Sequence, residues 1–527
     1  MKGLSVALAL AGGAWMRLWM LKALPQVNGD TLLYGNLAKN LLLHRQFAIT
    51  DGSGVAHQTL IRLPGYPLFL VLCFRLFGLD NYTAVSYLQI GLELAGCLLL
   101  AAFVRRIASD RAALWTLALA ALCPFTAAYA VAPLTETPTL FAIALALWAL
   151  ARFHAHPGWG SALAFTFAVS FAALLRPDGA LVGVALVPAL VVSLWNGEGR
   201  LSVLKGHGFS RAAGGTNRSE ALAAEGRRAG ESTSPQGLKP SLAQRSADGA
   251  AQAAPFQGLE SGAITRIRLL RMAAVCIVLA LLPFAIWTAR NWRVFHVFEP
   301  LAPRYATDPG EATNPGWQRW MKTWCLDFVS TYDIYWNVPG GPFDLNKLPG
   351  RAFDSPAEHA KTAALVAAYN DNGQDLSPEL DARFAQLAAE RVRAHPLRYY
   401  VWLPLGRMAD MWVRPRVENL NIDLDWWVYG HHYAETRFSW AYAGLNAAYL
   451  LLALAGLCFK PRYWPWMLLY LALRSALLMT IEAPEARYTL ECFPMIFALA
   501  GIGIDRSSMK LVSIYAKRKP LQPLISQ

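Results

Sequence analysis

The sequence predicts an all-α polytopic membrane protein. Of its 527 residues, 55% are hydrophobic and only 16% are charged, and the mean hydropathy is +0.29. Apolar runs recur along the chain at the length that a bilayer-spanning helix needs, roughly 20 residues. Length alone would favour about three soluble domains. The repeated apolar runs and the scarcity of charge exclude a soluble multidomain protein.

Ten apolar runs are predicted to span the membrane, at residues 4–24, 83–104, 112–132, 136–153, 160–175, 179–195, 270–289, 440–459, 463–481 and 489–505. An even number of spans places both ends of the chain on the same side. The tail from Arg506 to Lys519 is basic, and basic segments are retained in the cytoplasm, so both termini are predicted to be cytoplasmic.

The distribution of charge and cysteine excludes other classes of protein. The net charge of +13 lies mainly in the predicted cytoplasmic segments, and no basic stripe alternates with exposed aromatic residues, so nucleic acid is not an expected partner. Of the seven cysteines, only Cys325 lies in a long polar loop, and no CxxC motif occurs. The cysteines indicate neither a disulfide framework nor a metal site, and no cofactor is expected. A divalent metal remains possible, although no compact Asp/His cluster indicates one.

Arg17 interrupts the first apolar run. No small-x-small cleavage site precedes Gln26, so this run is interpreted as a signal anchor and not as a cleaved signal peptide. A charged side chain in the hydrocarbon is costly, so Arg17 is expected to extend to the outer surface or to face a polar cavity.

The apolar runs divide the chain into six parts. These are an N-terminal transmembrane module with a first outer loop at 25–82, a basic cytoplasmic loop, one further transmembrane helix, a long extracytoplasmic loop, C-terminal transmembrane helices and a basic cytoplasmic tail, at residues 1–195, 196–265, 266–289, 290–439, 440–505 and 506–527. The cytoplasmic loop is rich in Ala, Gly, Ser, Arg and Gln without an apolar period, so it is predicted to be disordered.

Two segments of the first outer loop are predicted to lie along the membrane. Leucines recur at helical spacing through residues 31–43, which indicates an amphipathic helix. Residues 64–79 are apolar but too short to span, and Arg75 interrupts them, which indicates an interfacial helix.

The long outer loop is predicted to contain helices of its own. Ser355-Pro356 and Ser377-Pro378 each combine a helix-capping residue with proline at the first helical position. The second of these helices should end near His395-Pro396. Residues 398–415 are apolar but charged at Arg407 and Asp410, so we expect a helix that lies against or dips into the outer leaflet; a span there would raise the count to eleven.

Ionisable residues of both signs gather at the predicted outer ends of the spans, whereas the cytoplasmic ends carry mainly Lys and Arg. The outer group comprises Asp30, Glu136, Arg176, Asp178, Arg290, Glu482, Glu485 and Arg487. Ionisable groups near a membrane are costly, so their convergence on one face indicates a function. A lipid-linked phosphosugar would use both signs: arginines bind its phosphate, and a carboxylate accepts the proton of an attacking hydroxyl.

Each of these residues also has a purely structural interpretation. Asp30 suits the N-cap of a helix starting at Thr31, and Glu136 suits a first helical turn. The sequence Arg176-Pro177-Asp178-Gly179 is typical of a tight turn. Arg290 could anchor at the headgroups beside Trp287. His431 and His432 are adjacent in sequence and cannot both face one metal from a helix, so "DLDWWVYGHHY" is interpreted as an interfacial aromatic segment.

An ordered set of motifs carries a resemblance to a known superfamily. The stretches are "GDTLLYGNLAKNLLLHRQF", "RLPGYPLFLVLCFRLFG", "LTETPTLF", "LLRPDGAL", "WTARNWRVF", "LAAERVRAHPLRYY" and "EAPEARYTLECFPMIF". Together they resemble the GT-C glycosyltransferases, in particular the dolichyl-phosphate-mannose protein mannosyltransferases and their bacterial aminoarabinose- and mannosyltransferase-like members. The likeness covers nearly the whole chain except residues 196–265.

The resemblance implies a GT-C fold and a set of site residues. The Asp of the first outer loop, which is catalytic in this family, matches Asp30; the following residue is Thr31, so the common Asp-Glu pair is absent. Glu136 matches the acidic residue of the second outer loop. Arg487 and Tyr488 match the Arg-Tyr before the last span, a phosphate contact. The further phosphate candidates are Arg62, Arg176 and Arg290.

The implied activity is transfer of a sugar, with inversion, from a polyprenyl-phosphate donor to an acceptor outside the cytoplasm, with Asp30 as general base. The acceptor could be a protein, a lipid or a glycan, and the expected location is the inner membrane of a bacterium. Two other classes remain open from the sequence, a transporter or flippase of lipid-linked sugars and a non-catalytic scaffold of the cell envelope. Transporters place substrates near the midplane between related halves, which this sequence does not show.

Overall fold

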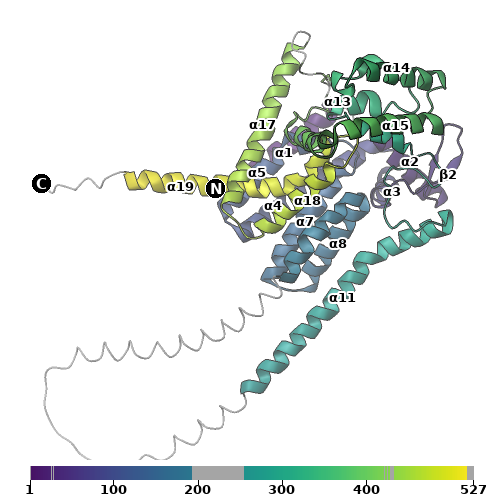
Figure 1. Cartoon of the computed structure of the whole chain (residues 1–527). Coiled ribbons are helices and arrows are strands. Elements are labelled where there is room, and N and C mark those ends of the chain that lie inside the picture. The colour runs from purple at the N-terminus through teal and green to yellow at the C-terminus, as the bar shows by residue number, and fades with distance from the viewer. Residues whose placement is uncertain are drawn as a thin grey trace, which may run out of the picture.

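A computed structural model describes residues 2–24, 27, 29–192, 254–420, 422, 423, 425, 427 and 432–518. Helices dominate this part of the chain (Figure 1). The sheet found there has two short antiparallel strands, β1 (Ala48–Thr50) and β2 (Ala56–Gln58), with Ile49 opposite His57. The prediction of an all-α polytopic protein is confirmed.

Six helices of the described part are long and apolar enough to cross a membrane. They are α1 (Lys2–Ala23), α4 (Tyr82–Ile107), α7 (Glu136–Ala155), α11 (Ala254–Phe295), α17 (Tyr433–Cys458) and α19 (Phe493–Arg518), the last preceded by the 3₁₀ segment η6 (Ala486–Cys492). A seventh candidate is the pair α5 (Asp110–Ala121) and α6 (Pro124–Ala130), which is bent by 54°.

The remaining three predicted spans are shorter apolar helices, α8 (Trp159–Leu175), the helix Pro177–Val192 and α18 (Trp464–Leu478). Each of the ten predicted runs is therefore helical where it is described, but the count of ten spans is not confirmed. The bend between α5 and α6 was not predicted, because the run 112–132 is apolar throughout. Pro124 is the residue in this run that marks the break.

Polar side chains on one face of α4 bind the backbone at this broken span. Ser86 Oγ donates to the carbonyl of Val131 (2.7 Å), and Gln89 Nε2 donates to that of Ala132 (2.7 Å). Both carbonyls lie between α6 and α7, where no helical partner is available. In a membrane such groups must be satisfied inside the protein, so this stripe of α4 fixes the segment that leads to Glu136.

Arg17 of α1 is also a polar side chain that binds backbone carbonyls inside the protein. Its side chain is 0% exposed, pairs with Glu93 of α4 (Nε to Oε2, 2.6 Å) and donates to the carbonyls of Gly13 (2.9 Å) and Ala121 (2.6 Å). The expectation that Arg17 extends to the surface or faces a polar cavity is wrong. Glu93, far away in the sequence, supplies the partner that makes burial tolerable.

The transmembrane helices pack closely around a shared core. Between α17 and α19, a Cβ atom on Gly456 would lie only 1.9 Å from the carbonyl oxygen of Leu499, so this contact requires a residue without a side chain. Phe125, Phe493 and Tyr449 fill the space beside it with edge-to-face ring contacts. The core thus holds η6, which carries Arg487, against the N-terminal module.

The long outer loop forms a second packed unit. It contains α12 (Pro315–Lys322), α13 (Phe328–Ser330), the π-helical turn η2 (Thr331–Tyr335), the 3₁₀ turns η3 (Leu345–Lys347) and η4 (Gly350–Ala352), α14 (Pro356–Asp371), α15 (Pro378–Ala394), the π-helical turn η5 (Arg398–Trp402) and α16 (Leu403–Val413). Trp317, Trp320, Trp324 and Phe384 are buried at its centre.

The predicted helix starts in this unit are confirmed. Ser355 caps α14 by accepting from the amide of Glu358, and Ser377 caps α15 by accepting from that of Leu380. Helix α15 ends at Ala394, as expected from His395-Pro396. Within residues 398–415, η5 and α16 form one continuous helical segment, residues 398–413, which is not among the six described helices long and apolar enough to cross a membrane.

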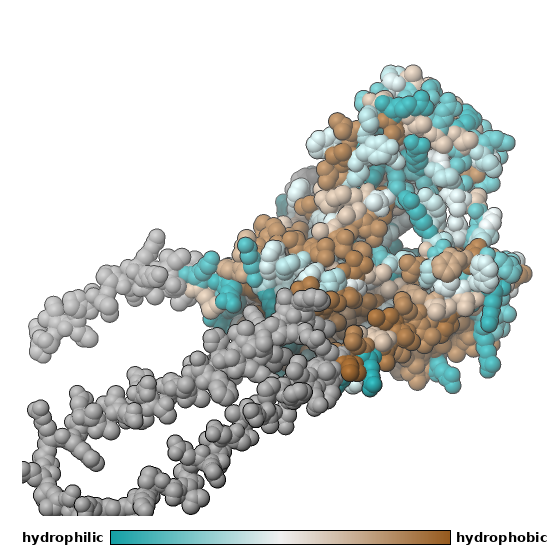
Figure 2. Space-filling view, turned by 60° about the horizontal axis from the view of Figure 1, so that its bottom comes forward, coloured by the Kyte–Doolittle hydropathy of each residue, from teal (hydrophilic) through white to brown (hydrophobic). Residues whose placement is uncertain are grey.

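Other boundaries differ from the sequence prediction. Helix α2 (Gly29–His44) contains the amphipathic segment 31–43, and α3 (Gly65–Phe77) corresponds to 64–79. Helix α11 begins at Ala254, so residues 254–265 of the predicted loop are helical, while residues 193–253 lie outside the described part. Helix α19 continues to Arg518 into the predicted tail, and residues 519–527 are not described. Figure 2 shows a hydrophobic body below a largely hydrophilic upper end.

Candidate active site

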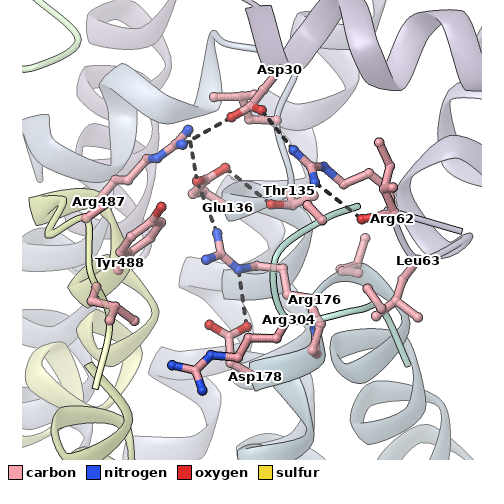
Figure 3. A pocket seen from close by; sticks show the side chains of 18 of the residues that line it. Asp30, Arg62, Leu63, Thr135, Glu136, Arg176, Asp178, Arg304, Arg487 and Tyr488 are labelled. Carbon is pink, nitrogen blue, oxygen red and sulfur yellow. Dashed lines mark hydrogen bonds and ion pairs between the residues drawn. The ribbon is translucent and has the colours of Figure 1, made fainter. Parts of the chain in front are cut away.

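A cavity of about 470 Å³ lies where the ends of several helices meet. The transmembrane helices and their connections contribute α2, the segment before α3, the start of α7, the turn after α8, the end of α18 with the segment that follows it, and the start of η6. The outer unit contributes residues 302–306 and 335–336 (Figure 3). Its charged lining residues are Asp30, Arg62, Glu136, Arg176, Asp178, Arg304, Glu482 and Arg487. The cavity therefore collects all the predicted site residues except Arg290.

Asp30 is the open carboxylate of this cavity. Its side chain is 33% exposed, and arginines approach both of its oxygens: Arg487 Nη2 at 3.1 Å and Arg62 Nη2 at 3.5 Å (Figure 3). Burial raises the pKa of Asp30, but the charges of Arg487 and Arg62 outweigh it and hold the pKa below its usual range. Helix α2 begins at Gly29, so Asp30 lies inside the first turn and does not occupy the N-cap expected for a helix starting at Thr31.

Glu136 is covered, in contrast to Asp30. It is the first residue of α7 and only 2% exposed, with Arg176 Nη1 at 3.3 Å and Arg487 Nη1 at 3.9 Å from its Oε1. The hydroxyl of Thr135 lies 3.4 Å from Oε2. Glu136 thus links two arginines and has little surface left for a substrate, so its geometry suits positioning of the guanidinium groups.

Arg487 is shared among several carboxylates. Its Nε lies 2.5 Å from Glu485 Oε2, and Glu485 also accepts a short hydrogen bond from the Tyr488 hydroxyl. Burial raises the pKa of Glu485, against the opposing effect of Arg487. The guanidinium carbons of Arg487 and Arg176 lie 5.6 Å and 5.4 Å from the centre of the Tyr488 ring, which holds both groups at the cavity wall.

Arg176 also pairs with two further carboxylates. Its Nε is 3.3 Å from Asp178 and 3.0 Å from Glu491, and both carboxylates also pair with Arg474, at 2.7 Å and 2.6 Å. Arg474 and Glu491 were not among the site residues predicted from the sequence. Both lie inside or beside apolar runs interpreted as spans, and a charge within such a run is the signal that would have found them.

Arg290 lies outside the cavity. Its guanidinium donates to the carbonyls of Thr59 (2.7 Å) and Phe47 (2.9 Å) and lies 5.3 Å from the centre of the Trp287 ring. These contacts attach α11 to the segment around β1 and β2. The structure therefore gives Arg290 a structural setting and does not bring it near Asp30.

A second charged group lies where Glu482, in the segment between α18 and η6, meets two cations of the outer unit. Glu482 pairs with Lys322 Nζ (2.6 Å) and with Arg304 Nη2 (3.1 Å). Tyr335 and Trp336 line the same wall. Among the described residues, the ion pairs link the members of each charged group and do not join the two groups to each other.

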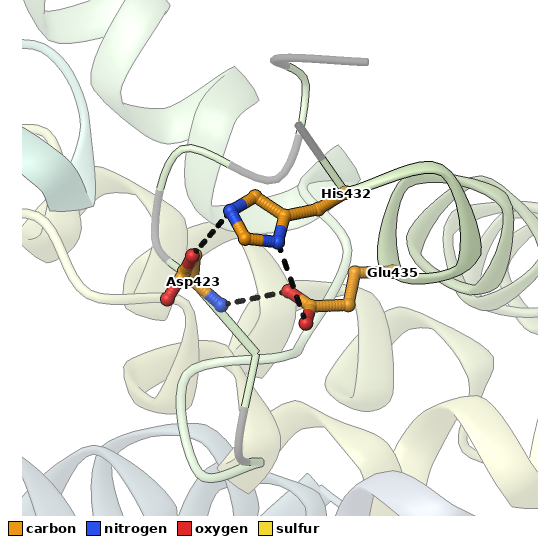
Figure 4. A group of neighbouring side chains, drawn as sticks. All are labelled: Asp423, His432 and Glu435. Atoms are coloured by element: carbon orange, nitrogen blue, oxygen red, sulfur yellow. Dashed lines mark hydrogen bonds and ion pairs between the residues drawn. The ribbon is translucent and has the colours of Figure 1, made fainter. Parts of the chain in front are cut away.

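A separate cluster lies at the start of α17. His432 is placed between Asp423 (Nε2 to Oδ2, 2.9 Å) and Glu435 (Nδ1 to Oε1, 3.9 Å), as Figure 4 shows. One potential ligand atom from each residue lies within 4.8 Å of the others. The two ring nitrogens face different carboxylates, so the present arrangement is that of an ion-pair cluster. His431 lies outside the described residues.

Chemically, the cavity combines one accessible, ionised carboxylate with guanidinium groups fixed by buried acids. Such guanidinium groups bind planar or tetrahedral oxyanions through paired hydrogen bonds. A hydroxyl placed next to Asp30 would have a proton acceptor within reach.

Comparison with known proteins bears on part of this site. Residues 62–209 match the family of dolichyl-phosphate-mannose-protein mannosyltransferases. This segment includes Arg62, Glu136 and Arg176 of the cavity, and its last residues lie outside the described part. A search of curated proteins finds no match.

Solved structures show weaker likenesses. The archaeal oligosaccharyltransferase AglB from Archaeoglobus fulgidus, in complex with an inhibitory peptide and a dolichol-phosphate, is 10% identical with a TM-score of 0.44; the match covers 100% of this chain and 52% of AglB, so this chain spans about half of that length. ArnT from Cupriavidus metallidurans bound to undecaprenyl phosphate is 15% identical, with a TM-score of 0.35 and coverage of 98% and 81%. Its apo state is 14% identical, with a TM-score of 0.34 and coverage of 98% and 80%.

At these TM-scores the solved structures assign no role to any residue. The described part of the chain is that of a helical integral membrane protein, with six helices long and apolar enough to cross a bilayer. The segment 62–209, and with it Arg62, Glu136 and Arg176, resembles the dolichyl-phosphate-mannose-protein mannosyltransferases of the GT-C superfamily, as the sequence motifs predict.

Proposed function

We propose that this protein is a membrane glycosyltransferase that transfers a sugar from a polyprenyl-phosphate donor to an acceptor outside the cytoplasm. The observation that carries the proposal is the position of Asp30, an exposed carboxylate held between Arg487 and Arg62 in a cavity at the ends of the helices. The family match over residues 62–209 supports the same class of enzyme.

Asp30 acts as general base in the proposed reaction. The acceptor hydroxyl transfers its proton to the Asp30 carboxylate while its oxygen attacks the anomeric carbon of the donor sugar. The bond between that carbon and the phosphate oxygen breaks, and polyprenyl phosphate leaves with the bonding electrons. Attack from the face opposite the phosphate inverts the configuration at the anomeric carbon.

Arg487 and Arg62 bind the phosphate and stabilise the charge that develops as it leaves. Arg487 is already shared by Asp30 and Glu485, at 3.1 Å and 2.5 Å. A bound phosphate would compete with Asp30 for this guanidinium. The pKa of Asp30 would then rise from its lowered value toward its usual range, so donor binding would make the carboxylate a stronger base.

The buried acids have a positioning role in this scheme. Glu136 fixes Arg176 and Arg487, and Glu485 and Tyr488 orient Arg487 from the opposite side. Arg176 is engaged by Asp178 and Glu491, so we assign it a smaller share of phosphate binding than Arg487. The scheme assigns the phosphate charge to arginines and requires no metal ion.

The location follows from the same proposal. The long apolar helices would keep the polyprenyl chain in the bilayer, and the cavity would open on the extracytoplasmic face, with both termini in the cytoplasm and the protein in a bacterial inner membrane. The basic segments of the sequence support this orientation.

Turnover of labelled polyprenyl-phosphate sugars by the purified protein in lipid tests the proposal. We expect release or transfer of the sugar by the wild type, loss of both in Asp30→Asn, and unchanged rates in EDTA. Movement of intact labelled lipid across the bilayer without consumption of any donor would replace the enzyme by a transporter. Wild-type turnover that persists in Asp30→Asn would remove the assigned base.

A further inference from the structure

The wall that the outer unit contributes to the cavity differs in chemistry from the wall around Asp30. Trp336 and Tyr335 of the outer unit present an indole and a phenol, and Glu482, from the segment between α18 and η6, adds a carboxylate to the same cavity. Trp336 is 46% exposed although it directly follows η2, in which Thr331 and Ile334 are buried. An exposed indole on a cavity wall is available for a ligand, because the cavity volume of about 470 Å³ exceeds what a phosphate group alone requires.

Neighbouring rings hold the Trp336 side chain in place. Its ring centre lies 5.5 Å from that of Phe328 and 5.6 Å from that of Tyr332, both in edge-to-face geometry. Phe328 is itself buried in the outer unit. A ring supported in this way offers a flat apolar surface that loses little side-chain entropy when a ligand covers it.

Fixed polar groups line the same cavity as this ring. Glu482 is held by Lys322 at 2.6 Å and by Arg304 at 3.1 Å, and the Arg304 side chain remains largely exposed. Burial and the nearby Glu482 raise the pKa of Tyr335 to about 12, so its hydroxyl stays protonated and can donate. The wall therefore presents both charge-assisted acceptors and donors beside an apolar platform.

This combination matches a sugar ring. A pyranose has an apolar face of C–H groups, which pack on an aromatic ring, and a rim of hydroxyls, which bind carboxylate and guanidinium groups. The donor phosphate has its own arginines around Asp30, and within the described residues no ion pair connects that group with Glu482. The wall around Trp336 is therefore free to bind a second molecule.

We propose that Trp336, Tyr335 and Glu482 form a saccharide subsite, in which a sugar ring of the acceptor binds while the donor occupies the cavity around Asp30. The assignment to the acceptor rests on the proposed function. The presence of a saccharide site does not rest on the proposed function, because it is inferred from the chemistry of Trp336, Tyr335 and Glu482 alone. The acceptor class is then a glycan or a glycolipid headgroup.

Binding of a panel of defined soluble di- and trisaccharides to the full-length protein in lipid nanodiscs tests the subsite, with saturation-transfer NMR as the readout. We expect at least one saccharide to bind the wild type, and Trp336→Ala to weaken that binding at least tenfold. Trp336→Phe keeps an aromatic ring and should lose less. The matched control is Trp402→Ala, since Trp402 is 65% exposed on the outer unit and does not line the cavity.

Melting temperatures separate contact from folding. A loss of binding in Trp336→Phe or Glu482→Gln at an unchanged melting temperature supports direct contact. The subsite is overturned if no saccharide of the panel binds, if Trp336→Ala binds like the wild type, or if Trp402→Ala loses as much affinity as Trp336→Ala.

Competition distinguishes the acceptor from the sugar of the donor. Saccharide binding should persist at saturating polyprenyl phosphate and at saturating polyprenyl-phosphate hexose. Displacement by the sugar-bearing lipid alone would show that the ring belongs to the donor sugar and would overturn the acceptor assignment. Saccharide binding without consumption of any donor would contradict the proposed function and leave the subsite in place.

Discussion

Two arginine–carboxylate systems in this protein have the same chemical groups and different surroundings. Arg17 and Glu93 pair at 2.6 Å between α1 and α4, and Arg487 and Asp30 pair at 3.1 Å at the cavity. The hollow beside Glu93 measures about 30 Å³, close to the volume of one water molecule, whereas the cavity beside Asp30 measures about 470 Å³.

The two arginines also differ in whether their binding partners leave room for a ligand. Arg17 binds Glu93 and two backbone carbonyls, so its environment is closed and holds the helices together. Arg487 is shared by Asp30 and Glu485 and faces open space that a ligand can enter. A charge pair inside a membrane protein thus indicates a binding site only where the surrounding structure leaves room for a second molecule.

The largest expected effect is on turnover. Asp30→Asn removes the proposed base and keeps the size of the side chain, so we expect the rate to fall about 10²- to 10⁴-fold, the usual contribution of a general base. The measurement is release or transfer of labelled sugar per folded molecule. An unchanged melting temperature would show that the loss is chemical.

Asp80→Asn is the matched control for this variant. Asp80 forms an exposed pair with Lys39 at 3.1 Å and lies outside the cavity lining. Its φ is 57°, a backbone conformation that asparagine tolerates. Equal losses in both variants would show that the effect of Asp30→Asn is not local.

The next effect is on stability and concerns the closed pair. Arg17→Ala leaves Glu93 without its cation and the Ala121 carbonyl without its donor, so we expect a loss of about 3–5 kcal/mol in the free energy of unfolding. Thermal unfolding in detergent measures it. The double variant Arg17→Met with Glu93→Leu should recover most of the loss, because two apolar side chains bury no charge.

Activity per folded molecule should be nearly unchanged in that double variant. If it loses turnover as Asp30→Asn does while folding normally, the closed pair has a part in the reaction, and the distinction between the two arginine systems fails.

A smaller effect is expected on the pH dependence of the reaction. Burial raises the pKa of Asp30, but Arg487 and Arg62 outweigh this effect. In the kcat/KM profile, which reports the enzyme without bound donor, the carboxylate therefore becomes active above a pKa that is below its usual value. Arg487→Gln removes one of these charges and raises that pKa, so the acidic limb of the pH–rate profile should move to higher pH. The rate at neutral pH should fall about 10²- to 10³-fold, since one charge-stabilising donor is lost.

The profile of Arg290→Gln serves as the comparison, because Arg290 binds backbone carbonyls away from the cavity. Its acidic limb should coincide with that of the wild type. If the limb of Arg487→Gln does not move, the titrating group is not Asp30.

The sequence was most informative where local patterns decide the structure. Apolar runs and Ser-Pro caps predicted the helices. The positions of the outer-end motifs predicted that Asp30, Glu136 and Arg487 would share one cavity, and all three line it. It was least informative about pairing between helices. Which carboxylate meets Arg17 depends on the rotation of α1 against α4, and no local pattern encodes that rotation.

The same limit explains the remaining differences at the cavity. Arg474 and Glu491 come from separate segments and pair directly at 2.6 Å. Arg290 turns toward the strand segment although it lies at a helix end like the others. Helix ends on one face of a membrane share a region of space, but the direction of each side chain is set by tertiary packing.

The smallest expected effect lies in the outer unit, where neither arginine system takes part. Ser377 caps α15 through the amide of Leu380, so Ser377→Ala should cost about 0.5–2 kcal/mol of local stability. Hydrogen exchange of the α15 amides measures this loss, and Ser377→Thr, which retains a hydroxyl cap, is the control. Turnover should remain at the wild-type level in both variants, because α15 contributes no residue to the cavity lining. A fall in turnover would mean that the stability of the outer unit sets the position of the wall around Trp336. Turnover would then depend on both units and not only on the pair of Arg487 and Asp30.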